Sequence, residues 1–511
     1  MTALTGPELG FGRLLHAEWT KFRTVRGWVI GMVAAALVTV LLGLIAPLGG
    51  QRECVGPHGT TCAKPTQPVG PDGEAVTDGV YFVHQPLGRD GAITVRVASL
   101  TGQIPPLDDP RPGAAMKPGL VPWAKAGLLV RASTRQGSPY AAVMTTGHHG
   151  VRMQYDYTHD AAGTLTGSTG WLRLVRSGDT LTGYESSDGR HWKKIGTAHL
   201  AGLPATVPAG LFVASPAYEV TTQSFGGTST DGGASEATAA FDHLSLQGGR
   251  SGGTWHGAQI GSGGGGPQTP GFQQSNGTFH LTGSGDIAPA VAGPEGDDVE
   301  GSLIGAFAGL LVVIVVATLF ITAEYRRGLI RTSLAADPRR GVLLLSKAVV
   351  LGAVTFVAGL AAAAIAFFVV RAIRHSKGDL VLPVTWSTEL RVIAGTAALL
   401  AVAAVLALAL GTLLRRSAAA VATGIVLIVL PYILAVASVL PVSPAQWVLR
   451  ISPAAAFAIQ QSIPQYAQVD AAYTPSTGYF PLSPWAGFAV LCGWTALALG
   501  FAIVTLRRRD A

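Results

Sequence analysis

Six long apolar runs, none with a charged residue, set the strongest constraint on this chain of 511 residues. The runs cover residues 27–48, 303–322, 348–370, 392–414, 418–440 and 485–506. Each reaches the roughly 20 apolar residues that a helix needs to cross about 30 Å of hydrocarbon. Because lipid offers the backbone no hydrogen-bond partner, a span of this length is helical. The sequence therefore predicts a polytopic α-helical membrane protein with six transmembrane helices and one large insertion.

The positions of Lys and Arg predict the orientation, because positive charge is retained in cytoplasmic loops. Residues 1–26, 323–347 and 507–511, with the turn at 415–416, hold 15 Lys and Arg. The two short loops on the other side, 371–391 and 441–484, hold five. Both termini are therefore expected in the cytoplasm, and residues 51–302 outside.

The charge balance of the insertion argues against a nucleic-acid partner. Residues 51–302 contain 16 Lys and Arg but 21 Asp and Glu, although the whole chain carries a net charge of +7. The basic residues in excess therefore lie beside the predicted spans, where they report topology. A basic surface for nucleic acid is not expected.

The cysteines agree with an external insertion. Cys54 and Cys62 follow the first run on the side predicted to be oxidising, where such a pair can close a small disulfide loop. Two free thiols are the alternative. Cys492 lies inside the last run and is expected to act as a small apolar residue.

The insertion is expected to be an antiparallel β-sandwich over about residues 79–247. Residues 151–158 alternate apolar and polar side chains, the pattern of a half-buried strand. Turn residues such as those at 177–179 and 187–189 separate several similar short runs. Many short strands without a convincing helix are typical of a sandwich. A Gly-rich stretch, 247–267, is expected to be a flexible linker, and residues 279–290 are expected to add further strands.

An ordered series of segments in the insertion resembles the concanavalin-like (laminin-G-like) jelly-roll family. The segments are Lys125–Arg131, Trp171–Gly178, Tyr184–Trp192 and Gly210–Val213. The resemblance covers about 160 residues, and since members of that family often bind carbohydrate, an external carbohydrate is a candidate partner. A fold is a poor guide to function, so the ligand stays open.

Three local patterns in the insertion have simpler explanations than catalysis or metal binding. Residues 186–192 are similar to the aspartate-box turn, but the spacing is short and occurs once, which favours a plain hairpin. His148, His149 and His159 have no Cys or acidic partner at ligand spacing, which favours solvated histidines over a metal site. Gly249-x-Ser251-x-Gly253 lies in a Gly-rich tract without the strand, turn and helix of a nucleophile elbow.

The chain carries no visible energy source of its own. No Asp, Glu, Lys, Arg or His lies within any of the six runs, although ion-coupled transporters usually place such a group at mid-membrane. A phosphate-binding loop needs Gly-Lys followed by Ser or Thr, and no Gly-Lys pair occurs. We therefore predict neither an enzyme nor a cofactor in this chain.

The segment after the second run differs from an ordinary positive loop. Its acidic residue, glycine and proline follow one another with the basic residues in a fixed order: Glu324, Arg326, Arg327, Gly328, Arg331, Pro338, Arg339 and Lys347. This order resembles the first cytoplasmic loop of type 2 ABC-transporter permeases. The departure is Leu329, where Thr is usual.

The N-terminal segment supports the same resemblance. Leu15, Trp19 and Phe22 are spaced to form an apolar stripe, with Lys21 and Arg23 beside it, as in an interfacial helix. Residues 14–24, which include Glu18, resemble the amphipathic helix that precedes the first span of these permeases.

The resemblance covers residues 11–50 and 300–511 and implies a working arrangement. Separate ATPase subunits, which bind ATP and Mg²⁺, would dock on the segment 324–347, and a second permease would complete the transmembrane unit. The location implied is a bacterial plasma membrane, and the function is that of an exporter. The alternative is a membrane-anchored carbohydrate-binding or sensory protein, and an intramembrane enzyme is a third hypothesis.

Overall fold

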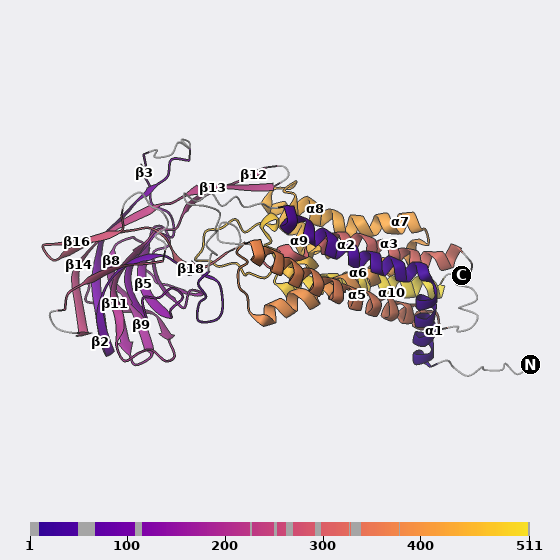
Figure 1. Cartoon of the computed structure of the whole chain (residues 1–511), viewed down its shortest axis with the longest axis horizontal. Helices are drawn as coiled ribbons and strands as arrows, with labels where there is room; N and C mark the ends of the chain where they lie inside the picture. Colours follow the sequence, from indigo (N-terminus) through magenta and orange to yellow (C-terminus); the bar gives the residue numbers. More distant parts are fainter. Residues whose placement is uncertain are drawn as a thin grey trace, which may run out of the picture.

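The computed structural model is elongated, with a strand-rich part at one end and a bundle of helices at the other (Figure 1). It describes residues 10–49, 67–107, 115–224, 227–249, 253–261, 269–291, 298–326, 328, 339–377 and 379–508. We call residues 67–291 the β domain, and residues 10–49 with 298–508 the helical domain. The helical domain ends, far from the β domain, at the pole where α1 lies (Figure 1).

Six helices of the described chain are long and apolar enough to cross a membrane, which confirms the predicted fold class. They are α2 (Arg26–Gly49), α3 (Gly305–Arg326), α5 (Arg340–Lys377), α6 (Trp386–Leu414), the interrupted pair α7 (Ser417–Gly424) and α8 (Leu430–Val436), and α10 (Pro484–Arg508). The described residues also form two shorter α-helices, α1 (Phe11–Thr24) and α9 (Val442–Ile451). Helix α5 extends past its apolar run at both ends, because long basic side chains can reach the interface.

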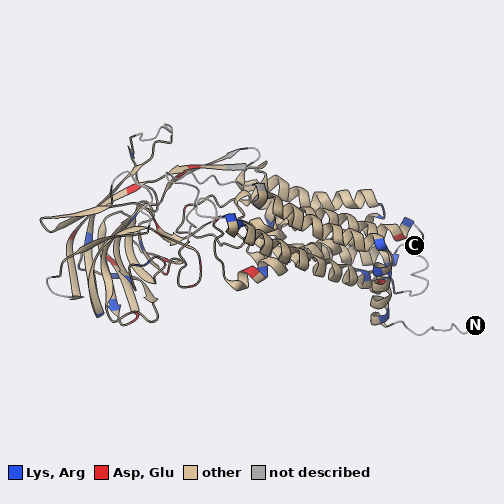
Figure 2. Cartoon of the chain, viewed as in Figure 1, with Lys and Arg blue, Asp and Glu red and all other residues tan. Residues whose placement is uncertain are grey.

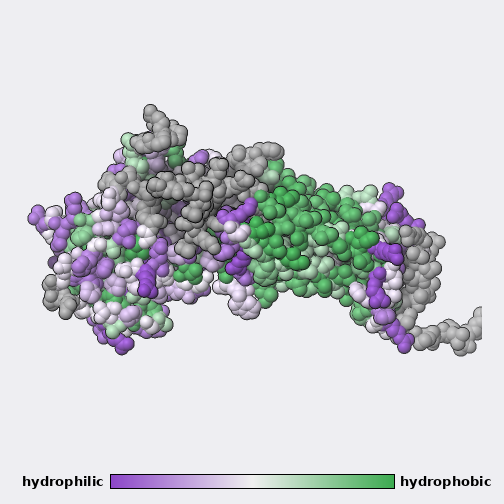
Figure 3. All heavy atoms as spheres, viewed as in Figure 1, coloured by the Kyte–Doolittle hydropathy of each residue, from purple (hydrophilic) through white to green (hydrophobic). Residues whose placement is uncertain are grey.

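The distribution of side chains along the bundle matches a membrane protein. A band of apolar residues covers the middle of the helical domain (Figure 3). Lys, Arg, Asp and Glu gather at its two ends (Figure 2). Helices α6 and α3 are the most buried of the six spans.

The fifth span is not a continuous α-helix. A π-helical turn, Ile425–Val429, separates α7 from α8. Pro431 follows within the first turn of α8 and has no backbone N–H to give to the preceding turn. A π-turn beside a proline is a common cause of a helix kink.

Two glycines bring α2 and α3 into close contact. A Cβ atom built on Gly305 would lie 2.0 Å from the carbonyl oxygen of Thr39, and one built on Gly309 would lie 2.0 Å from the Thr39 hydroxyl. Small residues at such crossings let helix backbones approach closely in lipid.

The β domain consists of two main sheets that share one strand. This strand, β2 (Val80–Ile104), has 25 residues, and its two halves pair with different neighbours. The remaining strands of these sheets are β3 (Lys117–Pro118), β4 (Lys125–Arg131), β5 (Tyr140–Thr146), β6 (Val151–Tyr155), β7 (His159–Ala162), β8 (Gly170–Ser177), β9 (Thr180–Ser186), β10 (Lys193–His199), β11 (Val207–Ala214), β14 (Glu236–Gly249), β15 (His256–Ile260), β16 (Gly271–Ser275) and β17 (Thr278–Gly283).

Strand order defines the two layers. The first half of β2 lies between β11 and β15, and β4, β5, β6 and β7 continue beyond β11. The second half lies between β8 and β14, with β9, β10, β17 and β16 outside them. Apolar side chains from both layers form one core, which includes Val95, Leu128 and Leu172. A hairpin of β12 (Tyr218–Ser224) and β13 (Gly227–Gly233) stands apart as a separate two-stranded sheet.

The structure differs from the sequence prediction at the C-terminal limit of the sandwich. The expected flexible linker, 247–267, contains β15, which pairs with β2 from His256 to Ile260. Strand β17 overlaps the segment 279–290 where further strands are predicted, and with β16 it extends the second layer beyond residue 247. Flanking glycines hide a five-residue strand from a composition argument, and β2 supplies the main-chain partner that orders it.

The chain enters and leaves the β domain at one place. Strand β1 (Val76–Asp78) pairs with β18 (Ile287–Pro289). Ala75 and Ala290, next to these strands, pack with Leu382 and Ile463 of two loops of the helical domain. The β domain therefore packs directly against the helical domain at this neck.

Candidate functional site

Helix α1 lies across the end of the bundle farthest from the β domain (Figure 1). The extended backbone of Val25 separates it from α2 and lets it turn across. Its buried residues are Leu14, Glu18 and Phe22. Trp19, a member of the predicted interfacial stripe, is 44% exposed. The face of α1 that packs on the bundle therefore carries an acidic residue, Glu18, at its centre.

A buried ion cluster joins three helices at this end. The Lys347 ammonium on α5 donates hydrogen bonds to Glu18 Oε2 of α1, at 2.7 Å, and to Glu324 Oε1 of α3, at 2.8 Å. The three residues are 1%, 5% and 4% exposed. Removing one partner of such a cluster leaves an uncompensated buried charge, at a cost of about 3–5 kcal/mol.

Lys21 completes the cluster from α1, where its ammonium also contacts Glu324 Oε1. Burial lowers the pKa of Lys21, but the hydrogen bond and charge of Glu324 outweigh burial, so the pKa lies above its ordinary value. Two acidic and two basic side chains thus balance one another, and the cluster is electrically neutral.

Aromatic rings enclose the cluster on its membrane side. The Lys347 ammonium lies 5.5 Å from the ring centre of Phe320. Phe22 and Trp28 pack on the same ring, with centres 6.0 and 5.6 Å away. These contacts exclude water, so the ion pairs lie in a medium where charge attraction is stronger than in water.

The other residues predicted for ATPase coupling are not all in the described part of the chain. Arg327, Arg331 and Pro338 lie outside it, as does the predicted disulfide of Cys54 and Cys62. The described members are placed around the cluster rather than in it: Arg326 ends α3, Gly328 has a φ of +67°, and Arg339 and Arg23 are exposed. The structure therefore brings together Glu18, Lys21, Glu324 and Lys347.

Sequence reasoning missed two further contacts beside the cluster. The guanidinium of Arg415, after α6, lies 5.3 Å from the ring centre of Tyr325. Arg340 donates a hydrogen bond of 2.8 Å to the carbonyl oxygen of Leu506 on α10. In the sequence Arg415 is only a topology signal, and Arg340 is only one of the basic residues of the segment 324–347. The local sequence could not predict these contacts, because each joins segments that are far apart in the chain.

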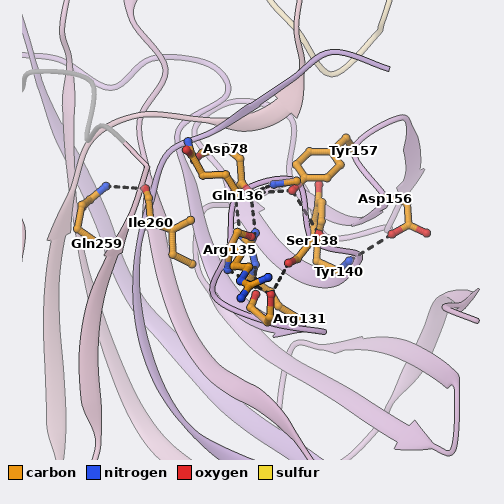
Figure 4. A network of polar contacts seen from close by, with 12 residues as sticks. Asp78, Arg131, Arg135, Gln136, Ser138, Tyr140, Asp156, Tyr157, Gln259 and Ile260 are labelled. Carbon is orange, nitrogen blue, oxygen red and sulfur yellow. Dashed lines mark hydrogen bonds and ion pairs between the residues drawn. The ribbon is translucent and has the colours of Figure 1, made fainter. Parts of the chain in front are cut away.

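A second polar network lies inside the β domain, close to its contact with the helical domain (Figure 4). Arg131 donates to both carboxylate oxygens of Asp78, at 2.8 and 2.6 Å, and Tyr157 donates to the same carboxylate at 2.7 Å. Burial alone lowers the pKa of Arg131, but its contacts with Asp78 outweigh burial and raise it. Burial, followed by the charge of Asp78, raises the pKa of Tyr157 well above its usual range.

The histidines and the turn that the sequence singled out have structural partners. His149 stacks on Trp123, with ring centres 4.1 Å apart, and His159 stacks on Tyr155 at 4.3 Å. Asp188 accepts hydrogen bonds of 2.8 Å from the backbone N–H groups of Arg190 and His191. Those N–H donors, with the His191 ring, hold the pKa of Asp188 below its usual range. Among the described residues, no group of three or more His, Cys, Asp or Glu is arranged to hold a metal.

The fold and the site define an integral membrane protein whose spans carry their charged residues near the bundle ends. The family model of the ABC-2 family transporter protein matches residues 191–511, more than half of the chain. The chain therefore belongs to the ABC-2 transporter family. It is a membrane-spanning permease subunit of an ABC transporter and is not itself catalytic.

Comparisons with individual proteins add little. No curated protein matches the chain. A protein of unknown function from Saccharomyces cerevisiae is 16% identical, with a TM-score of 0.20, over 33% of this chain and 74% of that chain. A mutant GH43 protein from Bacillus licheniformis is 15% identical, with a TM-score of 0.17, over 24% of each chain. TM-scores this low establish no common fold.

Proposed function

We propose that this permease works as an exporter in a plasma membrane, driven by separate ATPase subunits that dock at the pole where α1 lies. The proposal rests on the buried ion cluster, in which Lys347 of α5 donates hydrogen bonds to Glu18 of α1 and Glu324 of α3. Glu324 and Lys347 are the two ends of the segment 324–347, which the resemblance to type 2 permeases implies as the docking site. A force applied to that segment would therefore reach three helices at once.

We infer different roles for the buried and the exposed residues among those predicted for ATPase coupling. Glu324 and Lys347 are buried, so they position the helices, whereas Arg326, Arg331 and Arg339 are the residues we propose to contact the ATPase. Arginine suits such a contact because its guanidinium makes two parallel hydrogen bonds to a carboxylate. Closure of the ATPases on ATP would then tilt α1, α3 and α5 together and change access to the pathway.

A second permease copy or a sister subunit would complete the pathway. Helix α10 leaves most of its surface exposed, in contrast to α3 and α6, and is the face we propose for this contact. In this arrangement both termini are cytoplasmic and the β domain lies outside, as the Lys and Arg distribution predicts.

We propose that the β domain recognises or shields exported cargo, or an envelope glycan. Its resemblance to concanavalin-like domains supports a carbohydrate ligand, and its packing against two loops of the helical domain supports a role during transport. The alternative, that the spans merely display a sugar-binding or sensory domain, gives no role to the Lys347 cluster or the segment 324–347.

Co-purification with the ATPase tests the coupling proposal. We would tag the full chain, solubilise it from its native membrane, and identify and quantify a P-loop ATPase that comes with it. Arg326→Glu with Arg331→Glu should abolish recovery of the ATPase while the chain stays folded. Arg450→Glu, an exposed arginine on α9 at the other end of the bundle, is the matched control. Undiminished recovery with both arginines reversed would exclude this docking site.

Deletion of the insertion tests the β domain separately. A chain lacking residues 52–300 should keep its ATPase and its ATP hydrolysis but should export an altered set of substrates. Unchanged export of every substrate would refute a role for the β domain in cargo handling.

A further inference from the structure

A long apolar groove runs between α1, α2 and α5 on the membrane-facing side of the bundle. Its volume is about 1080 Å³. Pockets of ~300–1,000 Å³ already hold drug-sized molecules, so the groove admits a larger one. Apolar residues of α2 and α5 form its walls, among them Val33, Leu37, Val357 and Ile365, which are exposed.

The groove has the depth of one leaflet. On α2 its lining begins at Val29 and ends at Val40. Eleven residues of helix rise about 16 Å, and half of a hydrocarbon core is about 15 Å. The groove therefore extends from the level of α1 to near the membrane centre, which is the length of a lipid acyl chain.

The rim of the groove is basic. The lining at the α1 end of the groove consists of His16, Trp19 and Arg23. Arg13 and Arg26 are exposed on the same segment, and the one acidic residue between 11 and 49, Glu18, is buried in the Lys347 cluster. The ion cluster thus withdraws Glu18 from the rim, together with Lys21, and leaves Arg13, Arg23 and Arg26 at the surface.

We propose that this groove binds an anionic phospholipid of the adjoining leaflet, with its acyl chains between α2 and α5 and its headgroup at Arg23. The aliphatic walls suit the chains, and the basic rim suits a phosphate. A leaflet rich in anionic lipid attracts basic segments at about 1 kcal/mol per Lys or Arg. A second permease copy fits less well, because a twofold contact places the same surface patch of both copies together and would juxtapose two basic rims.

Lipid titration of the purified full chain tests the proposal. In a neutral detergent, phosphatidylglycerol should raise the thermal unfolding midpoint and be retained in native mass spectra. Phosphatidylcholine with the same acyl chains should do so far less. Equal effects of the two lipids would overturn the proposal, because the basic rim would then play no part.

Variants of the rim locate the headgroup. Arg23→Glu should weaken phosphatidylglycerol binding by roughly fivefold or more, the loss expected for one exposed charge contact. Arg23→Lys should keep most of the affinity. Arg508→Glu, an exposed arginine at the same pole that does not line the groove, should change nothing. Undiminished binding by the Arg23→Glu chain would overturn the assignment of the headgroup.

Variants of the walls locate the acyl chains. Ala361→Trp fills the groove and should remove the bound lipid, whereas Ala419→Trp, an exposed alanine on α7, should not. Val357→Trp serves the same purpose at a more exposed position if the first variant does not fold. If filling the groove instead dissociates a dimer and leaves lipid binding intact, the groove is a contact between copies and the proposal fails. The proposal does not depend on ATPase coupling.

Discussion

Gln468, in the loop before α10, donates a buried hydrogen bond of 3.1 Å from its side-chain amide to the carbonyl oxygen of Tyr157, 311 residues earlier. Tyr157 has a positive φ of 62° and lies in the turn between β6 and β7. The bond joins the helical domain to the network around Asp78 in the β domain. The β domain is therefore held by side chains as well as by its two chain connections.

Gln468→Leu should loosen the β domain without unfolding it. The substitution leaves the Tyr157 carbonyl without its buried donor, which costs about 1–3 kcal/mol. Hydrogen exchange should rise at residues 155–158 and in the loop 461–483, and the interior of the helical domain should stay protected. Gln274→Leu, an exposed position on β16, is the control. Unchanged exchange in both variants would contradict a structural role for the bond.

Lys347→Met should destabilise the helical domain strongly. The change leaves Glu18 and Glu324 close together, buried and without their shared cation, at a cost of about 3–5 kcal/mol. Neutralising both carboxylates in the same chain, with Glu18→Gln and Glu324→Gln, should restore much of the thermal stability measured in detergent. A Lys347→Met chain as stable as the parent would show that the ion pairs contribute little. Lys193→Met, an exposed position on β10, is the matched control.

Gly305→Ala should separate α2 from α3. The added methyl group would meet the carbonyl oxygen of Thr39, which is backbone and cannot move away. Gly493 on α10 has no atom within 4 Å of an added Cβ. Gly493→Ala should therefore be neutral or stabilise the helix by up to ~1 kcal/mol. The opposite ranking of the two variants in thermal unfolding would refute the close crossing.

The contact at the neck should strengthen as the pH falls. Burial, followed by neighbouring acids including Asp72, raises the pKa of Glu74 and of Asp156 above their ordinary values of 4.5 and 3.8. His159 acts against this at Asp156, and Tyr466 faces Glu74 across the contact. A raised carboxyl pKa gives stability that is complete below the ordinary value and is lost as the pH rises through the raised one.

Thermal unfolding of the β domain between pH 4.5 and 8 checks this prediction. The midpoint should fall as the pH rises across that range, and Glu74→Gln should flatten the slope. Asp242, whose pKa is lowered to about 2 by its ion pair with Arg96, acts in the opposite direction only below its ordinary value of 3.8. A midpoint that rises with pH above 5 would contradict the assignment.

The limits of the transmembrane spans could be predicted because the hydrophobic thickness of the membrane determines their length. Lipid demands about 20 apolar residues per helix, so hydropathy alone locates α3 and α10 to within a few residues. The π-helical turn before Pro431 lies within an equally apolar run, so hydropathy does not detect it. The length of α5 was underestimated because its ends are basic and leave the hydrocarbon.

The candidate site could be predicted only in parts. Glu18 and Lys347 were each assigned from local patterns, but the bond between them joins residues 329 apart. Local periodicity identifies the apolar stripe of α1, but it counts apolar residues only and does not show that a distant lysine draws Glu18 into the bundle. In the same way, β15 is ordered by β2 rather than by its own Gly-rich surroundings.

The pairing of β1 with β18 has a consequence for how this architecture can change. Val76 and Pro289 are directly opposite one another, so the two ends of the 212-residue excursion between them stand about 5 Å apart. A short turn could bridge these two residues, and the chain would then be a helical domain without the β domain. Such modules can be gained, exchanged or lost at this point while the membrane core stays as it is.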